Sequence, residues 1–384
     1  MSWSVRSLSE IADFVLGKML DQAKNRGEPL PYLANVNVRW GEFDLSDLRE
    51  MRYEPHEMER YGLISGDIVM CEGGEPGRCA LWKGQRESMM IQKALHRIRP
   101  HVGLDSTFLY YAFLNIGKQN GFAPFFTGAT IKHLPREQLA RVPIRFPEWP
   151  EQKAIAAVLS SYDDLIATNQ RRIALLEDAA RRLYREWFVH LRFPGHESVP
   201  VKDGVPEGWQ VKSLGEVATL NYGKALKATD RKDGKVPVYG SSGIVGTHNQ
   251  ALVEGGSIVV GRKGNVGSLF FSPVPCFPID TVFYIAPAQA SYRTFLALHQ
   301  LNFISSDAAV PGLNRTYAHS LPILQPSEDV AATFERLVQP VFEQSQHLTE
   351  QNAQLARTRD LLLPKLMSGQ LDVSGIRLPD EVAA

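Results

Sequence analysis

The sequence predicts an α+β fold built from two tandem copies of one unit, each followed by a long helix, with the two helices paired as a coiled coil. Three observations support this prediction. Segments of the first half recur in the second half in the same order, each half contains short β-like runs, and each half is followed by a long helix-forming stretch. A length of 384 residues also fits two or three domains.

Three pairs of segments recur at matching places in the two halves. WSVRSLSEIADFVLGK (3–18) matches WQVKSLGEVATLNYGK (209–224), and GDIVMCEGGEPG (66–77) matches GSIVVGRKGNVG (256–267). Further along, LARVPI (139–144) corresponds to AHSLPI (318–323). The offset falls from 206 through 190 to 179, so the second copy has shorter loops. Matches that keep one order indicate an internal duplication.

The globular part of each copy is expected to be α+β. Runs such as GDIVM, GSIVVG, SLFFS and TVFYIA are separated by turn-forming residues. One helix is expected in each copy, over Ser106–Gln119 and Ser291–Phe303, with its first Ser as the cap. The expected segments are globular domains at 1–148 and 209–326, long helices within 149–192 and 327–370, a Pro- and Gly-rich linker at 193–208 and a tail at 371–384.

The two long helices are expected over Glu151–Leu191 and Glu328–Ser368. Residues in each step by alternating intervals of 4 and 3, which is the heptad spacing of a coiled-coil seam. The seam of the first helix is Tyr162, Ile166, Asn169, Ile173, Leu176, Ala180, Leu183 and Trp187, and the equivalent seam of the second is Val341, Ser345, Leu348, Asn352, Leu355, Arg359, Leu362 and Leu366.

Each seam needs an apolar partner, and the other helix is the obvious one. Packing of each helix on its own globular domain is the alternative. Asn169 and Asn352 would cost stability but would fix the register. Pro340 and Pro364 are expected to kink the second helix or to mark its ends.

The chain carries no motif of an autonomous enzyme. It lacks a phosphate-binding P-loop, a dinucleotide fingerprint, a nucleophile elbow, a zinc-protease motif and the Asn-Pro-Pro-aromatic motif of amino-methyltransferases. The cysteines Cys71, Cys79 and Cys276 fit no zinc spacing, so no metal site is expected. These absences favour a non-catalytic binding protein over an enzyme.

Composition indicates a cytoplasmic protein. No apolar run is long enough to span a membrane, the N-terminal stretch has no signal-peptide core, and reduced thiols are expected. The 42 basic and 42 acidic residues give a net charge of zero. A protein that grips nucleic acid alone is usually basic. Nucleic-acid binding would therefore need local basic faces and help from a partner.

One candidate for DNA contact is the glycine-framed turn GRKGNVG, with Arg262, Lys263 and Asn265. Arg and Asn side chains suit the edges of guanine and adenine, and Lys suits phosphate. The matching turn of the first copy, CEGGEPGRC, is acidic before Arg78, so the two turns offer different chemistry. The alternative is a purely structural hairpin shared by both copies.

A second candidate is the segment that precedes each long helix. It carries Lys132 and His133 in the first copy, and Asn314 and Arg315 in the second. These residues would be positioned by a rigid helix. Ordinary surface solvation is an equally good explanation.

The stretches PEWPEQKAIAAVLSSYDDLIATNQRRIALLEDAARRLYREWF and QNAQLARTRDLLLPKLMSGQLDV resemble the two conserved helices of type I restriction–modification specificity (S) subunits. The starts of the two copies, together with GRKGNVGSLFFS and CFPIDTVFYI, resemble the target recognition domains of that family. The likeness extends over nearly the whole chain.

The resemblance implies two target recognition domains that each recognise one half of a split DNA sequence. It also implies that the two helices pair antiparallel about a pseudo-twofold axis and set the gap between the half-sites. Two DNA-methyltransferase (M) subunits would bind the chain, and restriction (R) subunits would join later. S-adenosylmethionine and ATP would then be bound by those partners and not by this chain. The competing prediction is a coiled-coil scaffold or protein-interaction module that does not recognise DNA.

Overall fold

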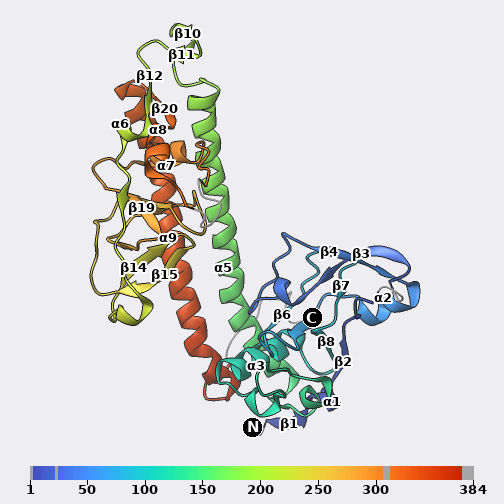
Figure 1. The fold of residues 1–384 in the computed structure, drawn as a ribbon. Helices are drawn as coiled ribbons and strands as arrows, with labels where there is room; N and C mark the ends of the chain where they lie inside the picture. Colours follow the sequence, from blue (N-terminus) through green and yellow to red (C-terminus); the bar gives the residue numbers. More distant parts are fainter. Residues whose placement is uncertain (1–2, 22–24, 306–311, 374–384) are drawn as a thin grey trace. The chain divides into compact units, whose positions relative to one another are not determined.

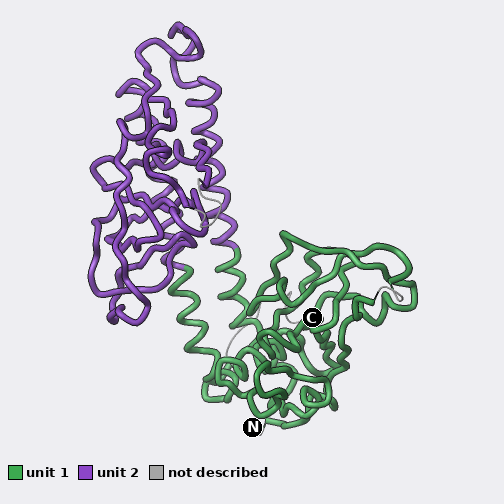
Figure 2. Tube along the Cα trace, in the orientation of Figure 1, with its two compact units in different colours: residues 1–167, 352–384 green, residues 168–351 purple. Residues whose placement is uncertain are grey.

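The computed structural model describes residues 3–21, 25–305 and 312–373 (Figure 1). It contains two compact units, the first made of residues 1–167 and 352–384 and the second of residues 168–351 (Figure 2). Each unit combines one globular copy with one half of each long helix. The segments expected from the sequence are consecutive stretches of the chain, whereas the compact units each join two separate stretches. The expected segment boundaries therefore stay predictions. Most of the tail expected at 371–384 lies outside the described residues.

Unit 1 contains two small sheets and a separate pair of strands. The four-stranded sheet has the order β2-β8-β5-β6, the three-stranded sheet has the order β4-β3-β7, and β1 pairs with β9. The strands are β1 (Ser4–Ser7), β2 (Ala12–Leu16), β3 (Glu28–Leu33), β4 (Arg49–Tyr53), β5 (Ile68–Cys71), β6 (Cys79–Leu81), β7 (Met90–Ile91), β8 (Leu95–Pro100) and β9 (Pro143–Phe146); the helices are α1 (Leu8–Ile11), α2 (Pro55–Tyr61), α3 (Ser106–Lys118) and α4 (Arg136–Leu139).

Unit 2 repeats this arrangement. Its four-stranded sheet has the order β13-β19-β16-β17, its three-stranded sheet has the order β15-β14-β18, and β12 pairs with β20. The elements are β10 (Val201–Lys202), β11 (Val205–Pro206), β12 (Gln210–Ser213), β13 (Asn221–Tyr222), β14 (Val236–Gly240), β15 (Gly243–His248), β16 (Ser257–Gly261), β17 (Leu269–Ser272), β18 (Phe277–Pro278), β19 (Val282–Ile285) and β20 (Pro322–Gln325), with the helices α6 (Leu214–Val217), α7 (Tyr292–Leu298) and α8 (Arg315–Ser320).

The repeat therefore holds down to the register of single strands. Ser7 lies opposite Pro143 in unit 1, and Ser213 lies opposite Pro322 in unit 2. Both serines begin a short helix with a capping box, in which the side chain of a Glu three residues later accepts from the serine amide. The predicted fold of two tandem α+β domains with two long helices is confirmed.

The helix expected in each copy is present, with two corrections. Asp105, and not Ser106, caps α3, because its side chain accepts a hydrogen bond from the amide of Phe108. Ser291 caps α7 as expected, but α7 ends at Leu298 and not at Phe303. A turn replaces its last residues, since the Leu301 amide donates to the Leu298 carbonyl three residues back.

The long helices are α5 (Trp149–Tyr184), of 36 residues, and α9 (Glu328–Met367), of 40 residues. A π-helical turn over Arg185–Val189 extends α5. Neither Pro340 nor Pro364 ends α9, contrary to one of the two expectations. Pro340 is exposed, so water can bond the carbonyl that its missing N–H leaves free, and Pro364 lies in the last turn.

The predicted seam residues lie on the packed side of both helices. All sixteen are buried or half-buried, including the two asparagines and Arg359. Three leucines off the seam are exposed, Leu165 at 52%, Leu175 at 61% and Leu361 at 69%, whereas Leu363, also off the seam, is buried in the core of unit 1. The Asn169 side chain donates to Gln351 in unit 2 (3.0 Å), so it bonds across to the other helix.

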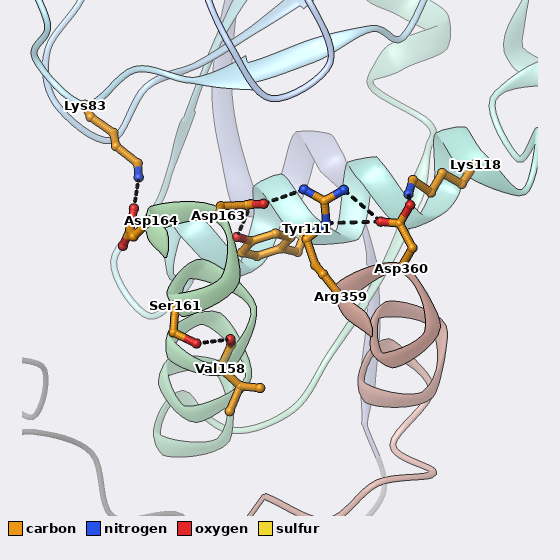
Figure 3. Close-up of polar contacts among 9 residues, drawn as sticks. All are labelled: Lys83, Tyr111, Lys118, Val158, Ser161, Asp163, Asp164, Arg359 and Asp360. Carbon is orange, nitrogen blue, oxygen red and sulfur yellow. Dashed lines mark hydrogen bonds and ion pairs between the residues drawn. The ribbon is translucent and has the colours of Figure 1, made fainter. Parts of the chain in front are cut away.

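Asp163 of α5 is bound from two sides in unit 1 (Figure 3). The Tyr111 hydroxyl of α3 donates to its Oδ2 (2.6 Å), and Arg359 of α9 forms an ion pair with its Oδ1. Arg359 also bonds Asp360 (2.8 Å), which pairs with Lys118 of α3 (2.5 Å). Burial lowers the pKa of Arg359, but the two carboxylates outweigh it and hold that pKa above its usual value. The network fixes α9 against α5 and α3.

Replacing Asp163 should destabilise unit 1. Asp163→Asn leaves the part-buried Arg359 with one carboxylate instead of two, so we expect the free energy of unfolding to fall by ~1–3 kcal/mol. Asp164→Asn is the matched control, because Asp164 pairs with Lys83 (2.9 Å) where both side chains are more than half exposed. Such pairs contribute at most ~1 kcal/mol. Urea unfolding measures both; an equal loss in the two variants would contradict the network's role.

Candidate nucleic-acid interface

The glycine-framed turn has the same backbone in both copies. The amide of Gly77 donates to the carbonyl of Cys71, and the amide of Gly267 donates to that of Gly261, both at 2.9 Å. Both glycines have positive φ, 89° and 77°, a conformation that side chains disfavour. The turn is thus a structural hairpin that carries different side chains in each unit.

A second shared bond connects the turn to the segment before the long helix. The Leu134 amide donates to the Glu72 carbonyl, and the Leu313 amide donates to the Arg262 carbonyl, both at 2.7 Å. The two candidate segments that were predicted separately therefore lie side by side within each unit. They form one composite surface per unit, which we call the tip: residues 71–79 and 127–136 in unit 1, and residues 261–268 and 312–317 in unit 2.

The tip of unit 2 gathers two arginines on one tyrosine. The guanidinium of Arg262 lies 4.9 Å from the ring centre of Tyr222, and that of Arg315 lies 5.1 Å from the same ring. Tyr222 is 49% exposed. Arg262 also donates to the Asp280 carbonyl (3.2 Å), which holds its side chain. A cation–π arrangement of this kind presents planar donors from a rigid base.

The other predicted residues of this tip have mixed roles. Lys263 is half-buried and bridges to Gly312 through the backbone, and Asn265 is exposed in the turn. The Asn314 side chain caps α8 by accepting from the Tyr317 amide (3.1 Å). The Asn314 side chain is therefore already engaged as an acceptor, and of the predicted residues only Arg262 and Arg315 contact the ring of Tyr222.

The tip of unit 1 is different. Arg78 does not extend from it, because its guanidinium donates to Glu75 (2.9 Å) and to the Asn35 carbonyl (3.0 Å). Lys132 and His133 are exposed. His133 lies against Gly73 of the turn, where a side chain would meet its ring at 2.9 Å. Of the three predicted residues, only Lys132 and His133 are presented to solvent.

Lys18 and Lys224, which end the first pair of recurring segments, differ in their exposure to solvent. Lys224 is exposed, but Lys18 is 4% exposed and pairs with Glu57 of α2 (2.5 Å) over the ring of Tyr53. Unit 2 has no helix at the place of α2. The insertion in the first copy therefore converts a surface lysine into a buried ion pair.

Tyr222 is the site residue that the sequence did not reveal. The equivalent position in the first copy is occupied by Leu16, so the repeat did not point to a tyrosine. A single tyrosine also belongs to no recognisable motif. Its place just before the recurring Gly-Lys pair was the one available signal. Three free cysteines are buried, and the described residues contain no group of three or more His, Cys, Asp or Glu side chains placed to hold a metal ion.

Comparison with known proteins finds one family. A family model described as "Type I restriction modification DNA specificity domain" matches residues 2–178 and 206–327, more than half of the chain. The MjaIX specificity subunit of Methanocaldococcus jannaschii is 26% identical, over 97% of this chain and 94% of that protein. The HindI specificity subunit of Haemophilus influenzae is 20% identical, over 63% and 72%.

Among solved structures, the type I restriction–modification S subunit from M. genitalium has the same fold. Its TM-score is 0.58 at 20% sequence identity, over 95% of this chain and 96% of that one. Within the part of the chain that the structure describes, no helix combines the length and the apolar composition needed to cross a membrane.

The tip of unit 1 should weaken in acid. His96 is fully buried, its Nε2 donates to the Leu134 carbonyl (2.9 Å), and burial lowers the pKa of its imidazole below 6.5. The unfolded imidazole takes up a proton more readily than the folded one. The contribution of His96 to the free energy of unfolding is therefore fully present above pH 6.5. It decreases as the pH drops below 6.5, by up to ~1.4 kcal/mol per pH unit.

His96→Gln should reduce this dependence, because an amide can donate to Leu134 without titrating. Thermal unfolding of both proteins from neutral to acidic pH gives the readout. The difference in midpoint between wild type and variant should shrink as the pH falls. A difference that stays constant with pH would show that His96 does not contribute to the acid response.

Proposed function

Since the chain belongs to the family of type I restriction–modification DNA specificity subunits, we propose that its two tips each recognise one half of a bipartite DNA target. Membership of this family makes the chain a DNA-recognition component and not a catalytic subunit. The observation that carries the proposal is the repeated tip: one backbone geometry, fixed by the same two hydrogen bonds, presents different side chains in the two units. That is what two related readers of different half-sites require.

In unit 2 we assign base and phosphate contact to the side chains around Tyr222. Arg262 and Arg315 offer planar donors that suit guanine edges or phosphate, and Asn265 offers an amide that suits adenine. In unit 1 we assign contact to Lys132 and His133. Arg78 is excluded from this group because Glu75 and Asn35 occupy its guanidinium.

The resemblance to type I specificity subunits implies the partners, and the near-neutral charge of the chain agrees with it. We propose that two methyltransferase subunits bind this chain in the cytoplasm, and that restriction subunits join them. S-adenosylmethionine and ATP would bind to those partners. The additional subunits would supply much of the phosphate neutralisation that a chain of zero net charge cannot supply alone.

Replacing the arginines of the unit 2 tip should change one half of the target only. Arg262→Gln and Arg315→Gln each remove a planar cation, and loss of a base contact costs ~1–3 kcal/mol. Methylome sequencing of a host that expresses the chain with its methyltransferase subunits should show relaxed specificity in one half-site and an unchanged second half-site. Lys202→Gln, at an exposed hairpin of the same unit, is the control. Unchanged specificity in both halves would favour the scaffold alternative.

The coiled coil should set the gap between the half-sites. One heptad inserted after Ala167 and one after Gln351 keeps the seam in register and lengthens the pair by ~10 Å. That length corresponds to about three base pairs. The same methylome readout should show a changed gap, or no methylation, with unchanged half-sites. Seven residues inserted at the Asp203–Gly204 turn should leave the gap unchanged. An unaltered gap in the helix variant would refute the ruler.

A further inference from the structure

A cavity of unit 1 is lined by four arginines. It has a volume of about 510 Å³ and follows the edge strand β2, with walls from β8, α2 and α4. The arginines come from three different elements, Arg60 from α2, Arg97 and Arg99 from β8, and Arg136 from α4. Two carboxylates, Asp13 and Glu59, also line the cavity. Asp67, which does not line the cavity, pairs with Arg99, so the four arginines exceed the three neighbouring carboxylates by one positive charge.

Arg97 is the least compensated of these cations. It is 6% exposed, and its Nη1 donates only to the backbone carbonyls of Glu59 (2.9 Å) and Gly62 (3.1 Å). Its buried Nε has no hydrogen-bond partner, and no carboxylate of the described residues lies within ion-pair distance. Burial lowers the pKa of its guanidinium. A buried cation with no carboxylate in direct contact is costly, and an anion in the cavity would reduce that cost.

The other arginines surround it in defined orientations. Arg99 is clamped by the fully buried Asp67 through two bonds of 2.7 and 2.8 Å. Arg136 is exposed and lies over the ring of Phe14 at 5.2 Å. Arg60 is exposed on α2. Two held and two exposed guanidiniums match an oxyanion that several forked donors can bind together.

Unit 2 has no such cavity chemistry at the equivalent place. Strand pairing puts Tyr284 of β19 at the position of Arg97, and no helix lies between β15 and β16 where unit 1 has α2. The first unit thus combines an acidic turn with a basic cavity, whereas the second unit has its cations in the turn itself. Arg136 belongs to both the cavity and the tip of unit 1, so the two surfaces are continuous.

We propose that the arginine cavity of unit 1 binds a phosphate of the DNA backbone, beside the half-site that this unit recognises. The proposal rests on the DNA-recognition function. A phosphate contact positions the protein on the duplex and carries no sequence information. It would give unit 1 the electrostatic attachment that its turn, with Glu72 and Glu75, does not provide.

The test uses the full chain assembled with its methyltransferase subunits and two duplexes of equal length, one with the target and one with scrambled half-sites. Arg60→Gln and Arg136→Gln are the test variants, since both side chains are exposed and their loss leaves the core intact. Arg86→Gln, exposed elsewhere in unit 1, is the matched control. Fluorescence anisotropy gives the affinity at several salt concentrations.

Each test variant should weaken binding to both duplexes by the same factor. The slope of log affinity against log salt should become shallower by ~0.9 for each lost phosphate contact. The Arg86 variant should match wild type. An unchanged slope, or a loss confined to the target duplex, would overturn the phosphate assignment.

Two further outcomes separate this proposal from its premise. If free nucleotide displaces the duplex from wild type but not from the Arg60 variant, the nucleotide phosphate and the duplex compete for the cavity, which supports the backbone assignment. If the wild-type assembly does not distinguish the two duplexes, the DNA-recognition function itself fails. Intact discrimination together with an unchanged salt slope refutes the cavity alone.

Discussion

Neither long helix can bury its apolar stripe alone, and this constraint organises the whole chain. A 36-residue and a 40-residue helix whose seam residues recur every heptad need an apolar partner in water, and here both the other helix and the globular cores supply it. The seam is not the whole packed surface, because Leu363 lies off it and is buried in the core of unit 1. Because the helices follow the two copies in sequence, their pairing assigns half of each helix to each compact unit.

Each globular copy attaches to this helix pair with its own chemistry. In unit 1, Asp163 and Arg359 form the polar network with Tyr111. The equivalent positions in unit 2 at an offset of 179 are Phe342 and Ala180, which belong to one apolar cluster. There Phe342 stacks on Tyr292 at 4.3 Å. One backbone arrangement is therefore held by charge in the first unit and by aromatic packing in the second.

The sequence was most informative where the physics is local or repeated. Heptad spacing located both helices and their packed sides, and recurring segments located equivalent strands. It was less informative where a side chain's partner comes from a remote insertion. Lys18 looks like Lys224 in the sequence, yet Glu57 of α2 buries it. Likewise, Arg78 looked free to bind DNA until the structure placed Asn35 beside it, and Tyr222 gained meaning only when the fold brought two arginines to its ring.

The unlike chemistry at Asp163 and Arg359 bears on how well the two halves of the chain match each other. The internal repeat means that two equivalent halves, each with one long helix, meet along those helices. In the present chain, a pair of second halves would set the Arg359 guanidinium against Phe342 and leave it with Asp360 alone. A pair of first halves would set Asp163 against Ala180 and leave that carboxylate without its counterion. The two halves therefore differ where their helices meet, and each fits the other better there than it would fit a second copy of itself.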